Sequence, residues 1–165
     1  MKELLDTLTA WQKEGRTPAR AVVVRTFGSA PRPEGAVMLV SDDDRMAGSV
    51  SGGCVEGAAF EEIQRARLDG HSRVIRYGIS DEQAWDVGLA CGGTIDVLVE
   101  PLVRPEAIDA ARASDGRAVV TPLPADSPSG VFGPHEPGPG ALPAAVLVVH
   151  EDGGLDGTLG SAEAD

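Results

Sequence analysis

The chain has two cysteines, Cys54 and Cys91, and each lies beside a pair of glycines in a short loop. The loops read G-S-V-S-G-G-C-V-E at 48–56 and G-L-A-C-G-G-T at 88–94. Paired glycines adopt positive φ readily and let another group approach the main chain, because they have no Cβ. A thiol in such a loop can act as a nucleophile or as a ligand for a soft metal, provided that it ionises.

The first of these loops runs directly into a helical pattern that extends from Val55 to about Leu68. The loop amides and the thiol of Cys54 would then lie at the positive end of a helix dipole, where anions and thiolates are favoured. The alternative is that Cys54 is a small buried residue beneath the helix. Cys91 precedes a strand and gains no helix dipole, so the packing interpretation is open for it as well.

Two further segments could contribute to a ligand site. The turn G-S-A-P-R at 28–32 combines a hydroxyl, free amides and the planar guanidinium of Arg32, which suits phosphate oxygens; the alternative is a rigid turn with a solvated arginine. The segment at 77–89 predicts a short helix capped by Ser80, which either presents Cys91 or simply packs. Two cysteines without a nearby histidine pair do not make a zinc site, so we expect no metal centre.

The elements that must position these loops alternate along the first hundred residues. An amphipathic helix carries Leu4, Leu5, Leu8 and Trp11 on one face and ends at Gly15, strands are expected at 21–26, 36–41, 73–77 and 94–100, and a helix at 55–68. Strands interleaved with helices predict an α/β fold, and we expect a mixed sheet with flanking helices in a single small domain.

The C-terminal third has a different composition. Residues 122–143 are rich in Pro, Gly and Ser, which predicts a loop, and a strand–turn segment is expected at 144–165. The pattern of strand, tight turn and small-residue loop at 37–51 recurs at 147–160, either as a structural repeat or by chance. In a repeat, a helix would begin near Ser161, so we expect the chain to be part of a longer protein or to act beside a separate partner.

Charge and hydropathy exclude several classes of protein. The 26 acidic and 14 basic residues give a net charge of -12, which argues against nucleic-acid and anionic-membrane surfaces. The N-terminus lacks the apolar core of a secretory signal, and no apolar run approaches the roughly 20 residues of a membrane span. Two cysteines in glycine loops do not resemble a disulfide scaffold, so we expect a reducing, cytoplasmic setting.

Several long motifs occur together in the order typical of one family. They are F-G-S-A-P-R-P-E-G-A-V-M, G-S-V-S-G-G-C-V-E, Y-G-I-S-D-E-Q-A-W-D-V-G-L-A-C-G-G-T-I-D-V-L-V-E-P and D-G-G-L-D-G-T-L-G. With these motifs the chain resembles the XdhC/CoxI family over nearly its whole length. The resemblance implies that residues 1–165 form the family's N-terminal domain, with a motif core at 20–102 and without the C-terminal Rossmann-type domain that the family usually adds.

The same resemblance implies a function. Members are similar to the xanthine dehydrogenase accessory factor, a chaperone that binds the molybdenum cofactor (molybdopterin, as mono- or dinucleotide). Such factors protect the cofactor while a cysteine desulfurase supplies its terminal sulfido ligand, and then pass it to an apo-hydroxylase of the xanthine or carbon monoxide dehydrogenase type. We expect the partners to be this client, the desulfurase, a separate Rossmann-type protein and a second copy of the chain in a homodimer.

Site residues follow from the resemblance and from the loop chemistry together. We expect Cys54 and Cys91 to face the metal end of the cofactor or to relay sulfur. The cofactor-binding set comprises Gly28, Ser29, Arg32, Ser49, Ser51, Gly52, Gly53, Cys54, Gly92 and Gly93. Within it, the phosphate would be held by Arg32, Ser49, Ser51, Gly52 and Gly53. Two alternatives remain open: a thiol-dependent oxidoreductase or transferase that uses the same loops, and a half-length protein that only dimerises.

Overall fold

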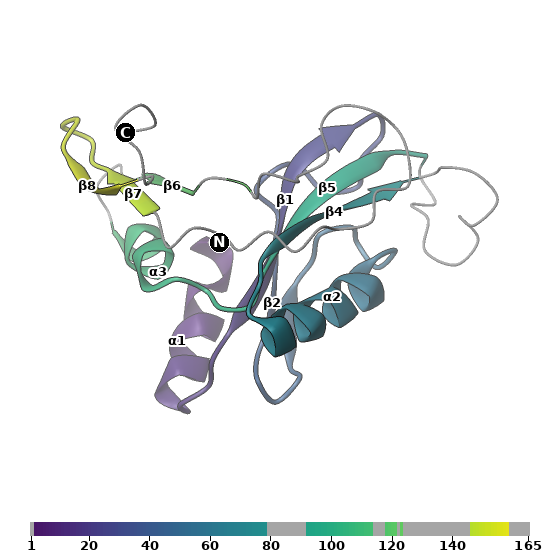
Figure 1. Cartoon of the computed structure of the whole chain (residues 1–165), viewed down its shortest axis with the longest axis horizontal. Helices are drawn as coiled ribbons and strands as arrows, with labels where there is room; N and C mark the ends of the chain where they lie inside the picture. The colour runs from purple at the N-terminus through teal and green to yellow at the C-terminus, as the bar shows by residue number, and fades with distance from the viewer. Residues whose placement is uncertain (1, 79–91, 114–117, 122, 124–145, 159–165) are drawn as a thin grey trace.

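The computed structural model describes residues 2–78, 92–113, 118–121, 123 and 146–158, and Figure 1 shows how its elements are arranged. In chain order these are η1 (Lys2–Leu4), α1 (Leu5–Lys13), β1 (Ala19–Phe27), β2 (Val37–Val40), β3 (Met46–Gly48), α2 (Glu56–Asp69), β4 (Arg73–Gly78), β5 (Thr94–Glu100), α3 (Pro105–Arg112), β6 (Ala118–Val120), β7 (Val146–Val149) and β8 (Leu155–Thr158). The expected short helix within 77–89 and the loop at 122–143 lie almost wholly outside the described residues.

The strands form two sheets, one of five strands in the order β3-β2-β1-β5-β4 and one of three in the order β6-β7-β8. The α/β class is confirmed, but every strand pair in the part of the chain that the structure describes is antiparallel, so the expected mixture of parallel and antiparallel strands is wrong. The connections explain this arrangement. Short links at 28–36 and 41–45 return the chain directly beside the strand it has left, and such links can join only antiparallel neighbours.

Helices cover both faces of the larger sheet, with α1 and α2 on opposite sides (Figure 1). Strand β2 shows why, because all four of its side chains are buried. Met38 and Val40 contribute to the core under α2, whereas Val37 and Leu39 contribute to the core under α1 and α3. Alternate side chains of a strand point to opposite faces, so a continuous apolar run predicts a strand buried on both sides.

The core beneath α2 rests on small and β-branched residues. The helix contributes Ala59, Ile63 and Ala66, all fully buried, against strands that are rich in valine and alanine. The helix begins at Glu56, one residue later than expected, and ends at Asp69, where Gly70 with a φ of 75° provides the left-handed cap. Within the described residues no helix is both long enough and apolar enough to cross a membrane.

The recurring pattern seen in the sequence corresponds to two hairpins of the same geometry. In the β2–β3 hairpin the amide of Ser41 donates to the carbonyl of Arg45 (2.9 Å), and in the β7–β8 hairpin His150 donates to Gly154 at the same distance. From Ser41 to His150 is 109 residues, and the same shift relates Gly48, with a φ of 79°, to Gly157, with a φ of 98°. The strand registers agree as well, because these two glycines pair with Met38 and Leu147, which are also 109 residues apart. The described parts of the two segments are therefore a structural repeat.

Candidate functional site

Two of the motif loops leave the larger sheet at the same end. Phe27, the last residue of β1, pairs with Thr94, the first residue of β5, and Thr94 also pairs with Gly78, the last residue of β4. The segment 28–36 therefore starts beside both ends of the segment 79–93. Residues 79–91, with Cys91 among them, lie outside the described part of the chain.

The third motif loop leaves from this end too. Gly48, the last residue of β3, pairs with Met38 near the start of β2, directly after the segment 28–36. We call residues 49–55 the Cys54 loop. All three segments leave the sheet at one end, and we call this end of the sheet the loop end. Antiparallel register thus brings motif residues as far apart in the sequence as Gly28 and Gly93 to the same end of the sheet.

At the loop end, the turn at Gly28 lies directly against the Gly92–Gly93 pair. A Cβ placed on Gly93 would be 2.5 Å from the carbonyl oxygen of Ser29 and 3.0 Å from the amide nitrogen of Ala30. These are backbone atoms, so the two turns can approach this closely only because residue 93 is glycine. The structure therefore brings together Gly28, Ser29, Gly92 and Gly93, four of the residues expected at the site.

The Cys54 loop is organised by a side chain that the sequence analysis did not single out, the carboxylate of Glu56. This residue is the first of α2, and its carboxylate accepts five hydrogen bonds from the loop. The donors to Oε1 are the hydroxyl of Ser49 (2.6 Å) and the amides of Val50 (3.1 Å) and Ser51 (2.9 Å), and those to Oε2 are the hydroxyl of Ser51 (2.5 Å) and the amide of Gly53 (2.8 Å). We call this arrangement the carboxylate clamp.

The clamp changes the acidity of Glu56. Partial burial acts to raise its pKa, but hydrogen bonds from Ser49, from Ser51 and from the backbone outweigh burial and lower the pKa from 4.5 to about 2. A carboxylate that accepts several hydrogen bonds is stabilised in its charged form. Glu56 is therefore ionised at every pH at which the protein would work, and the Cys54 loop contains a permanent negative charge.

The clamp gives four predicted phosphate ligands a different role. We expected Ser49, Ser51, Gly52 and Gly53 to hold a phosphate, but Glu56 takes the hydroxyls and most of the amides, and the Gly52 amide donates to the Ser49 hydroxyl (2.7 Å). The physical reason is proximity, because a carboxylate attached to the same helix start competes at high effective concentration with any free anion. In this structure these residues shape the loop.

Cys54 lies at the exposed side of the loop. On one side Gly53 donates to the clamp, and on the other Val55 is fully buried and donates its amide to the Ser51 hydroxyl (2.9 Å). Gly52 and Gly53 have φ values of 77° and 118°, and no atom lies within 4 Å of a Cβ built on either. The thiol is thus accessible on an open face while the backbone around it is fixed, which contradicts the alternative of a buried Cys54.

Arg32 is unusual among the arginines that the structure describes. The other ten donate hydrogen bonds or form ion pairs within the chain: Arg16, Arg20, Arg25, Arg45, Arg65, Arg67, Arg73, Arg76, Arg104 and Arg112. Arg32 has no such partner there, and its Nε is buried without a hydrogen bond. A buried guanidinium nitrogen without an acceptor is costly, so an acceptor supplied by a ligand would stabilise it.

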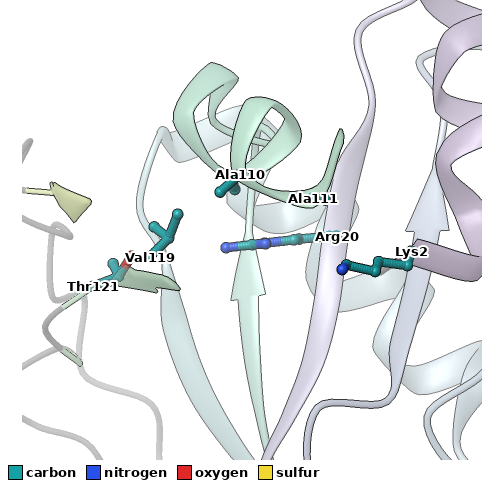
Figure 2. A pocket seen from close by; sticks show the side chains of 7 residues that line it. Lys2, Arg20, Ala110, Ala111, Val119 and Thr121 are labelled. Atoms are coloured by element: carbon teal, nitrogen blue, oxygen red, sulfur yellow. The ribbon is translucent and has the colours of Figure 1, made fainter. Parts of the chain in front are cut away.

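A cavity of about 230 Å³ lies elsewhere, between α3, β6 and the start of the chain, and is lined by Lys2, Arg20, Ala107, Ala110, Ala111, Val119 and Thr121 (Figure 2). Both cationic side chains point into it, but Arg20 also pairs with the buried carboxylate of Glu100. The cavity contains none of the motif residues. Among the described residues no group of three or more His, Cys, Asp or Glu side chains could hold a metal ion.

Comparison with known proteins explains why these motifs occur together. Residues 11–78 match the model of the XdhC and CoxI family, a range that includes the Arg32 turn, the Cys54 loop and α2. Over these residues the chain is similar to members of that family. The resemblance inferred from the sequence motifs is thereby confirmed.

Curated relatives carry names that are linked to molybdenum enzymes. The chain is 42% identical over 89 residues to the molybdenum cofactor insertion chaperone PaoD of Escherichia coli, and the aligned region covers 53% of this chain and 27% of that protein. It is 31% identical over 135 residues to a probable xanthine dehydrogenase subunit of Bacillus subtilis, and this aligned region covers 78% of this chain and 40% of that protein. The chain therefore spans less than half the length of either relative.

A solved structure supports the fold. A crystal structure described as a xanthine dehydrogenase from Bacillus halodurans aligns with a TM-score of 0.70 and 25% sequence identity over 98% of this chain and 45% of that one. The alignment includes both sheets, so the smaller β6-β7-β8 sheet is part of the shared architecture as well as the motif core.

Sequence reasoning missed Glu56, although a signal was present. The segment S-V-S-G-G-C-V-E places two hydroxyls and two flexible residues just before a carboxylate at a helix start. An acidic residue in the first turn is usually explained by the helix dipole alone. The number of small donors upstream of it was the feature that could have indicated a carboxylate reaching back into the loop.

Proposed function

We propose that this chain is the cofactor-handling part of a molybdenum cofactor insertion chaperone that serves a hydroxylase of the xanthine dehydrogenase class and assists its sulfuration. The names of the E. coli and B. subtilis relatives support a role in maturation of such enzymes. The observation that carries the proposal is the exposed thiol of Cys54, fixed at the loop end where the family motifs converge.

The residues present fit the chemistry of the cofactor. When bound, the cofactor supplies a molybdenum–dithiolene end, which prefers soft ligands, and a phosphate end, which prefers cations and hydrogen-bond donors. Cys54 is a soft donor with its backbone fixed on both sides. Arg32 is a cation without a partner among the described residues. We assign the first to the sulfur-rich end and the second to the phosphate end.

Cys54 can also relay sulfur without a change in net oxidation state. Its thiolate attacks the outer sulfur of a persulfide on the desulfurase cysteine, the donor S–S bond breaks, and the donor leaves as a thiolate. Cys54 then carries the new S–S bond as a persulfide. The reaction requires an accessible thiolate, and the position of Cys54 on the open side of the loop satisfies the requirement for access.

The remaining parts of the site and the partners follow from the family resemblance. We assign Gly28, Ser29, Gly92 and Gly93 to one wall of the site, and Cys91 would be a second thiol that faces the metal end of the cofactor or relays sulfur. The partners are the apo-hydroxylase, a cysteine desulfurase, a Rossmann-type protein or domain, and a second copy of the chain. The setting that this requires is the cytoplasm.

The test compares Cys54→Ser with wild type in the full chain, purified from a host that makes the cofactor, and Cys91→Ser is measured beside them as the second proposed thiol. Bound pterin is measured by fluorescence after oxidation, and bound molybdenum by mass spectrometry. We expect Cys54→Ser to lose most of the cofactor while circular dichroism remains unchanged. Unchanged retention together with unchanged sulfide content of the client would refute the proposal, and thiol-dependent turnover by cofactor-free protein would favour the oxidoreductase or transferase alternative.

A further inference from the structure

The acceptor capacity of the Glu56 carboxylate in the clamp is fully used. The two oxygens of a carboxylate offer about four lone-pair positions, and Glu56 receives five donors, three of them main-chain amides. A main-chain amide N–H can only donate a hydrogen bond, so each of these three amides needs an acceptor. The loop therefore requires an acceptor-only group of the length of glutamate at residue 56.

Hydrogen bonds rather than packing hold the exposed part of the loop. Val50, Ser51 and Val55 are buried and anchor its two ends, but Gly52 and Gly53 have no neighbour within 4 Å of a Cβ position. Glycines at positive φ are also the residues with most conformational freedom to lose. Without the clamp, the described structure would leave this part of the loop with the hydrogen bond from the Gly52 amide to the Ser49 hydroxyl, and Gly53 would lose the acceptor of its amide.

Cys54 is linked to the clamp through both of its neighbours. The amide of Gly53 donates to Oε2 of Glu56, and the amide of Val55 donates to the Ser51 hydroxyl, which itself donates to the same Oε2. We infer that Glu56 is a positioning residue that fixes the Cys54 thiol in one orientation for its ligand, an inference that rests on the role proposed above for Cys54. A residue that acts only on helix stability would not be connected by hydrogen bonds to the residues on both sides of Cys54.

Two substitutions separate the features of the clamp. Glu56→Gln keeps the shape of the side chain but replaces one of the two carboxylate oxygens with an amide NH₂ group, so that an N–H donor faces the donors of the loop. Glu56→Asp keeps the charge but shortens the reach by one methylene. Glu61→Gln is the matched control, because Glu61 is an exposed residue of the same helix and has no hydrogen-bond or ion-pair partner among the described residues.

The experiment uses the full chain with Cys91→Ser, so that Cys54 is the one cysteine present. A nitroxide spin label on Cys54 reports its mobility by electron paramagnetic resonance, and hydrogen exchange by NMR reports the amides of Val50, Ser51 and Gly53. We expect Glu56→Gln to convert an ordered label into a mobile one and to speed exchange of these amides by about tenfold or more, the effect of losing one charged hydrogen bond. Glu56→Asp should restore part of the order, and Glu61→Gln should change neither signal.

An ordered label and protected amides in Glu56→Gln would overturn the inference. If that variant does not fold, Ser49→Ala serves in its place, because it removes one donor from the clamp and should give intermediate mobility; an unchanged label there would also overturn it. Cofactor retention separates the two proposals. Retention is measured on unlabelled proteins that keep Cys91. A wild type that binds no cofactor refutes the role of Cys54, whereas equal retention by wild type and by a folded Glu56→Gln variant, whose label is mobile in the Cys91→Ser background, refutes the positioning role alone.

Discussion

Gly93→Ala tests whether the turns at the loop end depend on the close approach seen in the structure. The new Cβ would lie 2.5 Å from the Ser29 carbonyl oxygen, 2.7 Å from the carbonyl carbon and 3.0 Å from the Ala30 nitrogen. Carbon–oxygen contacts of this kind settle at about 3.3 Å or more, so one turn must move by roughly 0.8 Å. Gly93 does not have a positive φ, so the clash is steric and not a matter of backbone conformation.

Overpacking of this kind costs about 1–3 kcal/mol. With a urea dependence of about 2 kcal/mol per molar for a chain of this size, the unfolding midpoint should fall by about 0.5–1.5 M. NMR shifts of the Ser29 and Ala30 amides should change as well, because these atoms must move.

The matched control is Gly57→Ala. Gly57 lies in α2 with no atom within 4 Å of a Cβ position, so alanine there should stabilise the protein by about 0.5–1 kcal/mol through helix propensity. Equal stability of Gly93→Ala and wild type, with unchanged amide shifts, would show that the two turns are not in contact and would refute the site as described.

Three further predictions concern charged groups. Because folding lowers the pKa of Glu56 from 4.5 to about 2, ionised Glu56 stabilises the protein fully above about pH 4.5, and this stabilisation is lost as the pH falls toward 2. After allowance for solvent screening, the free energy of unfolding of wild type should exceed that of Glu56→Gln by about 1–2 kcal/mol at neutral pH. A difference between their urea midpoints that does not shrink in acid would contradict this. Asp96 is 2% exposed and accepts two hydrogen bonds from Arg76 (2.6 and 2.8 Å), so Asp96→Asn should destabilise the fold by about 3 kcal/mol in thermal melts, whereas the exposed Asp109→Asn should not. Arg32→Gln should leave the unfolding free energy within about 0.5 kcal/mol of wild type, because it breaks no contact within the described chain, yet reduce cofactor retention; normal retention would remove Arg32 from the site.

Much of the local structure could be predicted from the sequence, because it depends on patterns that burial imposes on neighbouring residues. The run of four apolar residues in β2 predicts a strand buried on both faces, and the spacing of Ala59, Ile63 and Ala66 predicts the buried face of α2. Strand β8 shows the limit. Its sequence L-D-G-T has little β propensity, and the sequence pattern predicted a small-residue loop at 157–160 where the strand ends.

The composition of the site could be predicted only in part. Periodicity reports which side chains are buried and not which strands pair, so the meeting of the segments 28–36 and 49–55 at one end of the sheet depended on long-range register. The role of Glu56 was likewise hidden, because its carboxylate bonds to residues up to seven positions earlier in a loop whose conformation it helps to determine. A local pattern cannot show a contact that exists only once the loop has closed on it.

The clamp also limits where an anionic ligand can bind. A phosphate at the Cys54 loop would have to displace a carboxylate with a pKa of about 2 from five donors and would then lie beside that negative charge. The chain as a whole has a net charge of -12, so its overall field would not attract such a ligand either. These objections do not apply to Arg32, because its guanidinium pairs with no carboxylate among the described residues and its Nε is buried there without an acceptor. The physical argument therefore divides the proposed site into an anion-binding turn at Arg32 and a thiol-presenting loop at Cys54, and it assigns the serines and glycines of that loop to holding the thiol and not to holding the ligand.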